Sequence, residues 1–224
     1  RPSNELKARV LAAARAEAAP VRRTTRLMGL GMLAAAAGLL TFFFWQLGWF
    51  SLGERPLSFV LGTSGGWVVI AAVASWLALG RGGRMGGRPT STLIATAVGA
   101  PIVLFAWLMF WNLFYLPTRC PPGVSEYGTA CHELIVAMSA VMFTAFTAIR
   151  RFGDAVHPRS GGAALGVAAA SWSGLVLNLR CTCATPLHVG VGHVLPLVVA
   201  SVAGIALGGW LLRLRVPVPR PRPN

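Results

Sequence analysis

The chain has 224 residues, of which 55% are hydrophobic and only 12% are charged. About a quarter of the residues in a typical soluble domain are charged, so the composition excludes an ordinary soluble globular protein. A net charge of +14 would indicate a nucleic-acid partner if the protein were soluble. In a chain this apolar, the position of the charges relative to a membrane has to be considered first.

A basic segment with a helical apolar pattern opens the chain. Leu6, Val10 and Leu11 recur at helical spacing, and Pro20 ends the pattern. Two interpretations stay open for this segment, residues 1–26. It is either an amphipathic helix that lies on anionic lipid or a helix that docks its apolar face into a cytoplasmic partner protein.

Six long apolar stretches follow. A membrane-spanning helix needs about 20 mainly apolar residues, and such stretches occur at residues 27–47, 57–79, 92–116, 129–149, 161–179 and 195–214. The stretch 161–179 is rich in Gly and Ala, so we expect it to be tilted or shielded by its neighbours, and Pro196 suits the first turn of the last helix. We predict an all-α, polytopic membrane bundle of six helices over residues 27–214. The basic, Pro-rich residues 215–224 should form an extended tail.

The basic residues lie almost entirely on one side of this predicted bundle. With six spans, 17 of the 20 Lys and Arg residues fall in the termini and in the second and fourth loops. Only Arg55, Arg119 and Arg180 fall in the opposite loops. Lys and Arg collect on the cytoplasmic side because their translocation is disfavoured. The pattern therefore predicts that both termini are cytoplasmic.

The middle of the predicted spans contains no Asp, Glu, Lys or Arg. Pumps and proton-coupled transporters need ionisable side chains at membrane depth, where these groups are costly and therefore usually functional. The sequence thus argues against a transport function.

All four cysteines belong to the predicted outer side. Cys120 and Cys131 border the second outer loop, and Cys181 and Cys183 lie in the third. Three interpretations stay open: structural disulfides, a sensing site that binds a metal ion or switches between thiol and disulfide, and catalytic thiol exchange. A bond between Cys181 and Cys183 would strain the disulfide geometry, so we expect pairing between the loops.

Three of the four histidines, His132, His188 and His193, accompany these cysteines on the outer side. Cysteine and histidine are the ligands that soft and borderline metal ions prefer. The spacing C-x-C-x4-H-x4-H that begins at Cys181 is not a standard zinc pattern. The outer cysteine and histidine cluster is nevertheless a candidate site for a metal ion.

With these residues in view, the chain resembles the NrsF-like membrane anti-sigma factors over nearly its full length. The resemblance is carried by the short basic segment before the first span and by three motifs, which are Cys131-His132-Glu133-Leu134, His157-Pro158-Arg159, and Cys181 followed by two histidines. This family has six spans and restrains extracytoplasmic-function (ECF) sigma factors.

The resemblance implies a regulator of transcription in stress responses rather than an enzyme, located in the bacterial inner membrane. The cytoplasmic segment would hold an ECF-type sigma factor through Leu6, Val10 and Leu11, without direct contact to nucleic acid. Oxidants or metal ions acting on the sensing pair, Cys131 and Cys181, would release the sigma factor. Cys120 and Cys183 are additional thiols to which the family pattern assigns no role.

A membrane thiol-disulfide oxidoreductase is the alternative from another functional class. Such enzymes also carry two cysteine pairs in outward loops and pass electrons to a quinone. The missing C-x-x-C motif and the larger number of spans argue against this alternative.

Overall fold

The computed structural model describes residues 55–79, 88–115, 120, 125–151 and 157–212, with a few residues nearer the N-terminus. Five helical segments in these ranges are long and apolar enough to cross a membrane. They are α2 (Leu57–Leu79), α3 (Thr90–Tyr115), α4 (Thr129–Arg151), α5 (Pro158–Arg180) and a continuous run made of α6 (Pro186–His188), the π-helical η2 (Val189–Val194) and α7 (Leu195–Leu211). The described ranges contain no strand, so an all-helical architecture is confirmed for this part of the chain.

Part of the sequence-based prediction falls outside the described residues. The predicted first span, residues 27–47, is described only at four helical positions, and the tail 215–224 is not described. Leu6, Val10 and Leu11, the candidate partner-binding residues, also lie outside the description. Near them, Glu5 and Arg9 are helical and form an exposed ion pair of 2.9 Å.

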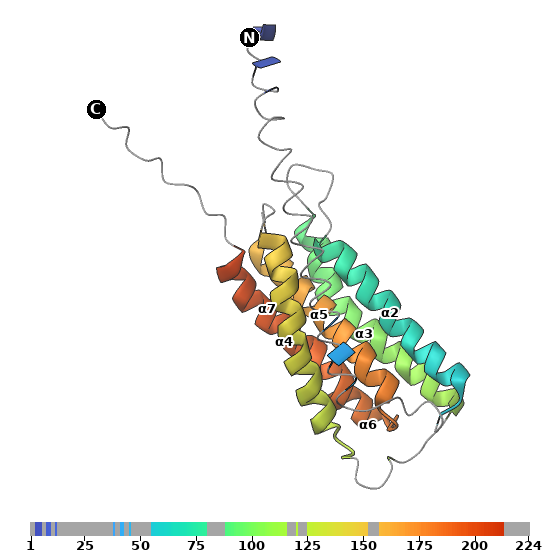
Figure 1. The fold of residues 1–224 in the computed structure, drawn as a ribbon. Coiled ribbons are helices and arrows are strands. Elements are labelled where there is room, and N and C mark those ends of the chain that lie inside the picture. The colour runs from blue at the N-terminus through green and yellow to red at the C-terminus, as the bar shows by residue number, and fades with distance from the viewer. Residues whose placement is uncertain are drawn as a thin grey trace.

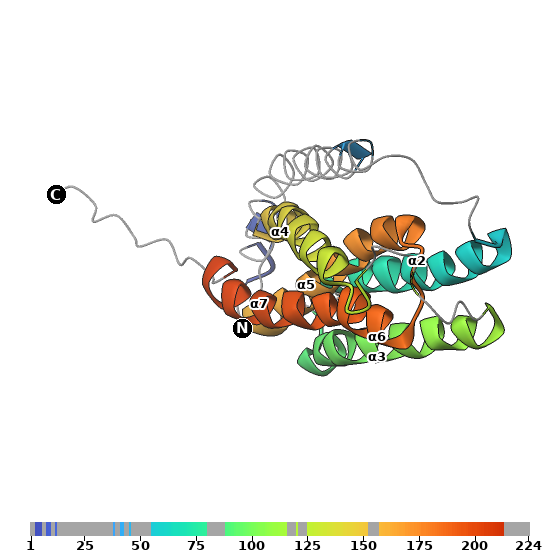
Figure 2. The ribbon, with the colours of Figure 1, turned by 90° about the horizontal axis from the view of Figure 1, so that it is seen from below.

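The helix α5 lies at the centre of the bundle and packs against α2, α3, α4 and α7 (Figure 1; Figure 2 shows the same bundle from below). Its small side chains allow this close approach. A Cβ atom at Gly162 would collide with the backbone carbonyl of Gly204 in α7, and one at Gly174 would collide with the buried ring of Trp67 in α2. The expectation that this Gly- and Ala-rich span is shielded by its neighbours therefore holds.

The last of these five segments begins at Pro186 rather than at residue 195 as predicted. Thr185 is its N-cap, and the Thr185 hydroxyl accepts a hydrogen bond from the backbone N–H of His188. Pro186 occupies the first turn, where its missing N–H costs nothing. Consequently His188 and His193 lie inside a helical segment and not in a loop.

The two ends of the bundle differ in chemistry. At one end, here called the cysteine end, lie the start of α4, the end of α5 and the start of the last helical run, with Cys120, Cys131, Cys181 and Cys183. At the other end, here called the basic end, lie Arg88, Arg150 and Arg159. A helix of 23 residues such as α5 is about 35 Å long, so the two ends are separated by about that distance.

Candidate functional site: a thiol and histidine cluster

The C-terminus of α5 is held in place by polar contacts with the start of α2. The Arg55 guanidinium donates hydrogen bonds of 3.0 Å to the backbone carbonyls of Asn178 and Leu179. The Asn178 amide donates to the hydroxyls of Thr63 and Ser64 at 3.2 and 3.1 Å. The bonds from Arg55 occupy two carbonyls that the helix itself leaves without partners. They fix the point at which the chain leaves α5 and thereby the position of Cys181, its C-cap residue.

A disulfide joins Cys120 to Cys183, with 4.6 Å between their Cα atoms. It links the segment before α4 to the segment after α5, so the pairing runs between the two predicted outer loops, as the spacing argument expects. Cys131 and Cys181 are free cysteines. The four cysteines thus divide into one covalent bridge and one pair of thiols.

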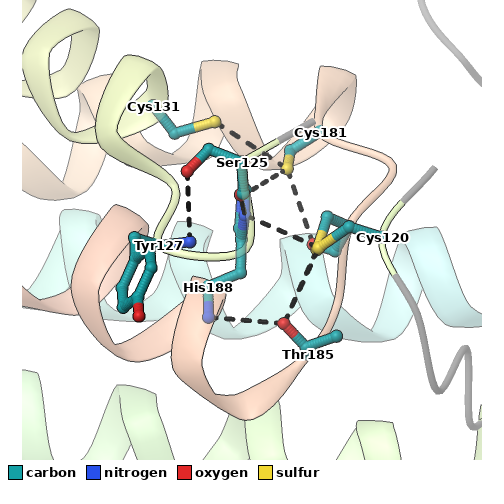
Figure 3. The surroundings of a disulfide bond; sticks show 8 residues. Cys120, Ser125, Tyr127, Cys131, Cys181, Thr185 and His188 are labelled. Carbon is teal, nitrogen blue, oxygen red and sulfur yellow. Dashed lines mark hydrogen bonds between the residues drawn. A yellow bond between two sulfur atoms is a disulfide. The ribbon is translucent and has the colours of Figure 1, made fainter. Parts of the chain in front are cut away.

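The two free thiols face each other. Cys131, in the first turn of α4, and Cys181, after α5, have their sulfur atoms 3.9 Å apart (Figure 3). Both side chains are half-buried. The sulfur atoms are too far apart for a disulfide, in which they lie about 2.05 Å apart. A relative movement of about 2 Å between the helix ends would close the bond.

His188 connects the thiol pair to the surrounding backbone. Its Nε2 lies 3.1 Å from the Cys181 sulfur, and its Nδ1 lies 2.9 Å from the carbonyl oxygen of Ser125 (Figure 3). Because a carbonyl oxygen can only accept, Nδ1 carries the proton in this contact. When Cys181 is a thiol, the neutral Nε2 accepts a hydrogen bond from it; when Cys181 is a thiolate, Nε2 carries a second proton and donates to the sulfur.

His193 completes the cluster from η2. Its ring centroid lies 5.4 Å from that of His188, and the side chain is buried. One ligand atom from each of Cys131, Cys181, His188 and His193 lies within 4.8 Å of the others. A second such group within the described residues consists of Cys120, Cys183 and His188. His132 belongs to neither group, and its Nδ1 lies 3.0 Å from the carbonyl oxygen of Val191.

The four-residue group fits the requirements of a metal ion such as Zn²⁺. Zn–S bonds of about 2.3 Å in a tetrahedron place two sulfur atoms about 3.8 Å apart, close to the 3.9 Å between Cys131 and Cys181. Ideal sulfur and nitrogen ligands lie about 3.5 Å apart, so His188 would need to withdraw by about 0.4 Å from Cys181. The bond from His188 Nδ1 to Ser125 is the outer contact that usually orients a ligating histidine.

The electrostatics of the cluster favour the thiolate form of Cys181. A hydrogen bond from Cys131 lowers the pKa of the Cys181 thiol far below its usual range, and contacts with His188 and His193 act in the same direction. Burial opposes the shift but is outweighed. A thiolate is both the metal-binding and the nucleophilic form of cysteine, so Cys181 is prepared for either chemistry.

A comparison with models of protein families identifies the family of this chain. The family model for NrsF, negative regulator of sigma F, matches residues 11–214 and so covers most of the chain, including all five described spans and the cluster. The chain belongs to the NrsF family. No curated protein and no solved structure shows significant similarity to it. Membership of the NrsF family makes the protein a negative regulator of a sigma factor, and a sigma factor its partner.

In this NrsF-family chain, sequence reasoning missed three residues that build the site. Arg55 donates to backbone carbonyls of α5, and Ser125 accepts from His188 with its own backbone carbonyl. A sequence carries no signal for contacts with the backbone. The third residue is Thr185, whose place before Pro186 is a recognisable helix start. Reading that signal would have placed His188 on a helix.

Proposed function

We propose that the protein is a membrane anti-sigma factor that holds an ECF-type sigma factor at the bacterial inner membrane and releases it when the cysteine cluster reacts. The observation that carries this proposal is the thiol pair Cys131 and Cys181, in which Cys181 is favoured as a thiolate and which lies between the start of α4 and the end of α5. The family supplies the negative regulation of a sigma factor. The cluster supplies the sensor.

The positive residues give the proposed orientation. The basic end and both termini face the cytoplasm, because Lys and Arg are retained there. The cysteine end then faces the periplasm, an oxidising compartment in which the bridge between Cys120 and Cys183 is stable.

An oxidant such as a peroxide would act on the thiol pair in two steps. The Cys181 thiolate attacks one peroxide oxygen, which yields a sulfenic acid and, after protonation, releases water or an alcohol. The Cys131 thiol then displaces the hydroxyl group as a second water and closes the disulfide. Two thiols lose two electrons and the peroxide gains them. Closure draws the start of α4 toward the end of α5.

A soft or borderline metal ion is the second proposed signal at the same place. Cys131, Cys181, His188 and His193 would hold it, and the ion would fix the four side chains in one arrangement. Either event changes how α4 sits against α5 and the last helical run. Packed helices can transmit such a shift to the basic end as a rigid displacement.

The segment 1–26 is the proposed sigma-factor binding element. Its apolar stripe would fill a groove on the partner, and a helix is supported at Glu5 and Arg9 by their ion pair. Replacing Leu6 and Leu11 by Asp should abolish co-purification of the sigma factor from native membranes while the protein still inserts. Replacing Glu5 and Arg9 by Gln, on the polar side, is the matched control and should retain the partner. Unchanged retention in the Leu variant would contradict this binding element.

A thiol-disulfide oxidoreductase remains the second candidate because the two cysteine pairs are adjacent. His188 Nδ1 lies 3.9 Å from the Cys120 sulfur, and His188 Nε2 lies 3.1 Å from the Cys181 sulfur. In such an exchange Cys181 would attack the disulfide and release one thiolate, and Cys131 would resolve the mixed disulfide and release the other. The reduced Cys120 and Cys183 would then pass the electron pair to an external acceptor such as a quinone and re-form their disulfide. Co-purification of a quinone and turnover with a dithiol would favour this function over sensing.

A further inference from the structure

A groove lies between α3, α5 and α7 near the basic end. Its volume is about 770 Å³, within the range of about 300–1,000 Å³ that is typical of ligand sites. It runs along the lateral surface of the bundle, from the start of α3 and α5 toward the middle of the helices. The lining residues are mostly aliphatic and include Ile94, Val98, Ile102, Val198, Val202 and Ile205.

The groove opens toward the surface that a membrane would cover. Val98, Ile102 and Val202 are 58%, 63% and 61% exposed, whereas Ala97 and Ala163 at its base are buried. Side chains of this kind at membrane depth contact lipid hydrocarbon. The walls therefore suit an extended apolar chain.

One end of the groove is polar and basic. His157, Arg159 and Ser160, which lie at the start of α5, line this end. The Arg159 side chain lies across Gly209 of α7, where an added Cβ would meet its Cγ at 3.3 Å. None of the described lining residues is acidic. The end of α4 carries Arg150 and Arg151, and the sequence between α4 and α5 holds the single acid Asp154, so the local charge is positive.

We propose that this groove binds an anionic phospholipid, with its phosphate at Arg159 and one acyl chain along the aliphatic walls. The groove has the amphipathic layout of such a lipid, which is long and apolar with one charged end. A free phosphate would leave the apolar walls unused. An extended peptide would bring backbone N–H and C=O groups that aliphatic walls cannot satisfy. This inference does not depend on the proposed function.

Native mass spectrometry of the purified full chain tests the proposal. The protein is equilibrated with equal amounts of phosphatidylglycerol and phosphatidylcholine that carry the same acyl chains. Phosphatidylglycerol should bind preferentially. Arg159→Gln should reduce the preference about fivefold, because one Arg at an anionic lipid surface is worth about 1 kcal/mol. Val202→Trp should reduce binding of both lipids by filling the groove.

Arg88→Gln is the matched control. Arg88 lies near the same end but packs over the ring of Trp76 at 4.2 Å and does not line the groove. This variant should keep the preference. Ile102→Trp provides a second groove-filling variant if Val202→Trp does not fold. Equal binding of both lipids, equal effects of the two Arg variants, or displacement of bound lipid by excess glycerol phosphate would each overturn the proposal.

Discussion

The neighbours of Cys181 favour its thiolate form, which is the nucleophilic form of cysteine. The pKa of its thiol is lowered first by the hydrogen bond from Cys131, so Cys181 should be a thiolate across the physiological range. Its alkylation by iodoacetamide, followed by mass spectrometry of the labelled peptide, should then be nearly independent of pH between pH 6 and 9. An ordinary cysteine has a pKa of about 8.5. Below this pH its thiolate fraction, and with it the alkylation rate, falls about tenfold per pH unit.

Replacing Cys131 by Ala removes the largest cause of the low pKa. The apparent pKa of Cys181 should rise, so the variant should lose alkylation at acidic pH while keeping it at alkaline pH. The depressed pKa also stabilises the fold above the pKa of the unfolded thiol, and this contribution is lost as the pH falls through the folded value. A pH profile that is the same in the variant and the wild type would contradict the assignment of Cys131.

Metal binding distinguishes His193, which belongs to the cluster, from His132, which is next to Cys131 in sequence only. Replacing His193, a member of the four-residue group, by Ala should weaken Zn²⁺ binding by about 100-fold or more, since even outer-contact residues are worth about 10–100-fold. His132→Ala is the control, because His132 contacts the Val191 carbonyl and lies outside the group. The measurement is competition with a chromophoric chelator. Equal losses in both variants would contradict the ligand set.

At the scale of helices, the packing of α5 against α7 depends on a few glycines. Gly162→Ala would force a Cβ into the Gly204 carbonyl, whereas the neighbouring Gly161 has open space at the same position. The first variant should destabilise the protein by about 1–3 kcal/mol. Gly161→Ala should be neutral or slightly stabilising because Ala is the better helix former. Thermal unfolding in detergent compares the two, and similar Tm values would contradict this packing.

Hydropathy located the described helices because a membrane span needs a minimum apolar length. Residues 57–79 were predicted with the bounds that α2 has. The start of the last helical run was missed because His188, Gly190, Gly192 and His193 lower the local hydropathy. Neighbouring helices bury the two histidines instead. Burial by other helices is a tertiary effect that no local window contains.

The site was only partly accessible from the sequence for the same reason. The residue types and the predicted topology place the cysteines and three histidines at the same end of the bundle. Which cysteines bond depends on how α4 and α5 pack, and the sequence left that open. The structure resolves it into a bridge, Cys120 to Cys183, and a free pair. His132, next to Cys131 in sequence, turns toward Val191 and leaves the cluster.

At the scale of the whole molecule, the chain separates a reactive end from a basic end by the length of the bundle. The central α5 begins at the basic end with Pro158 and ends beside Cys181. Other helices pack against it on several sides. Because such packing is dense, a displacement of the end beside Cys181 would also shift the neighbouring helices. This arrangement suits the proposed regulator, whose signal and partner would lie on opposite sides of a membrane.

Transcription from a sigma-dependent promoter, followed in cells after exposure to peroxide or Zn²⁺, tests the central claim most directly. Cys131→Ser, Cys181→Ser and the double variant should all keep basal repression and lose induction to the same extent, because the two thiols act as one pair. His132→Ala should be induced like the wild type. Normal induction in either single cysteine variant would contradict the claim that this pair is the sensor.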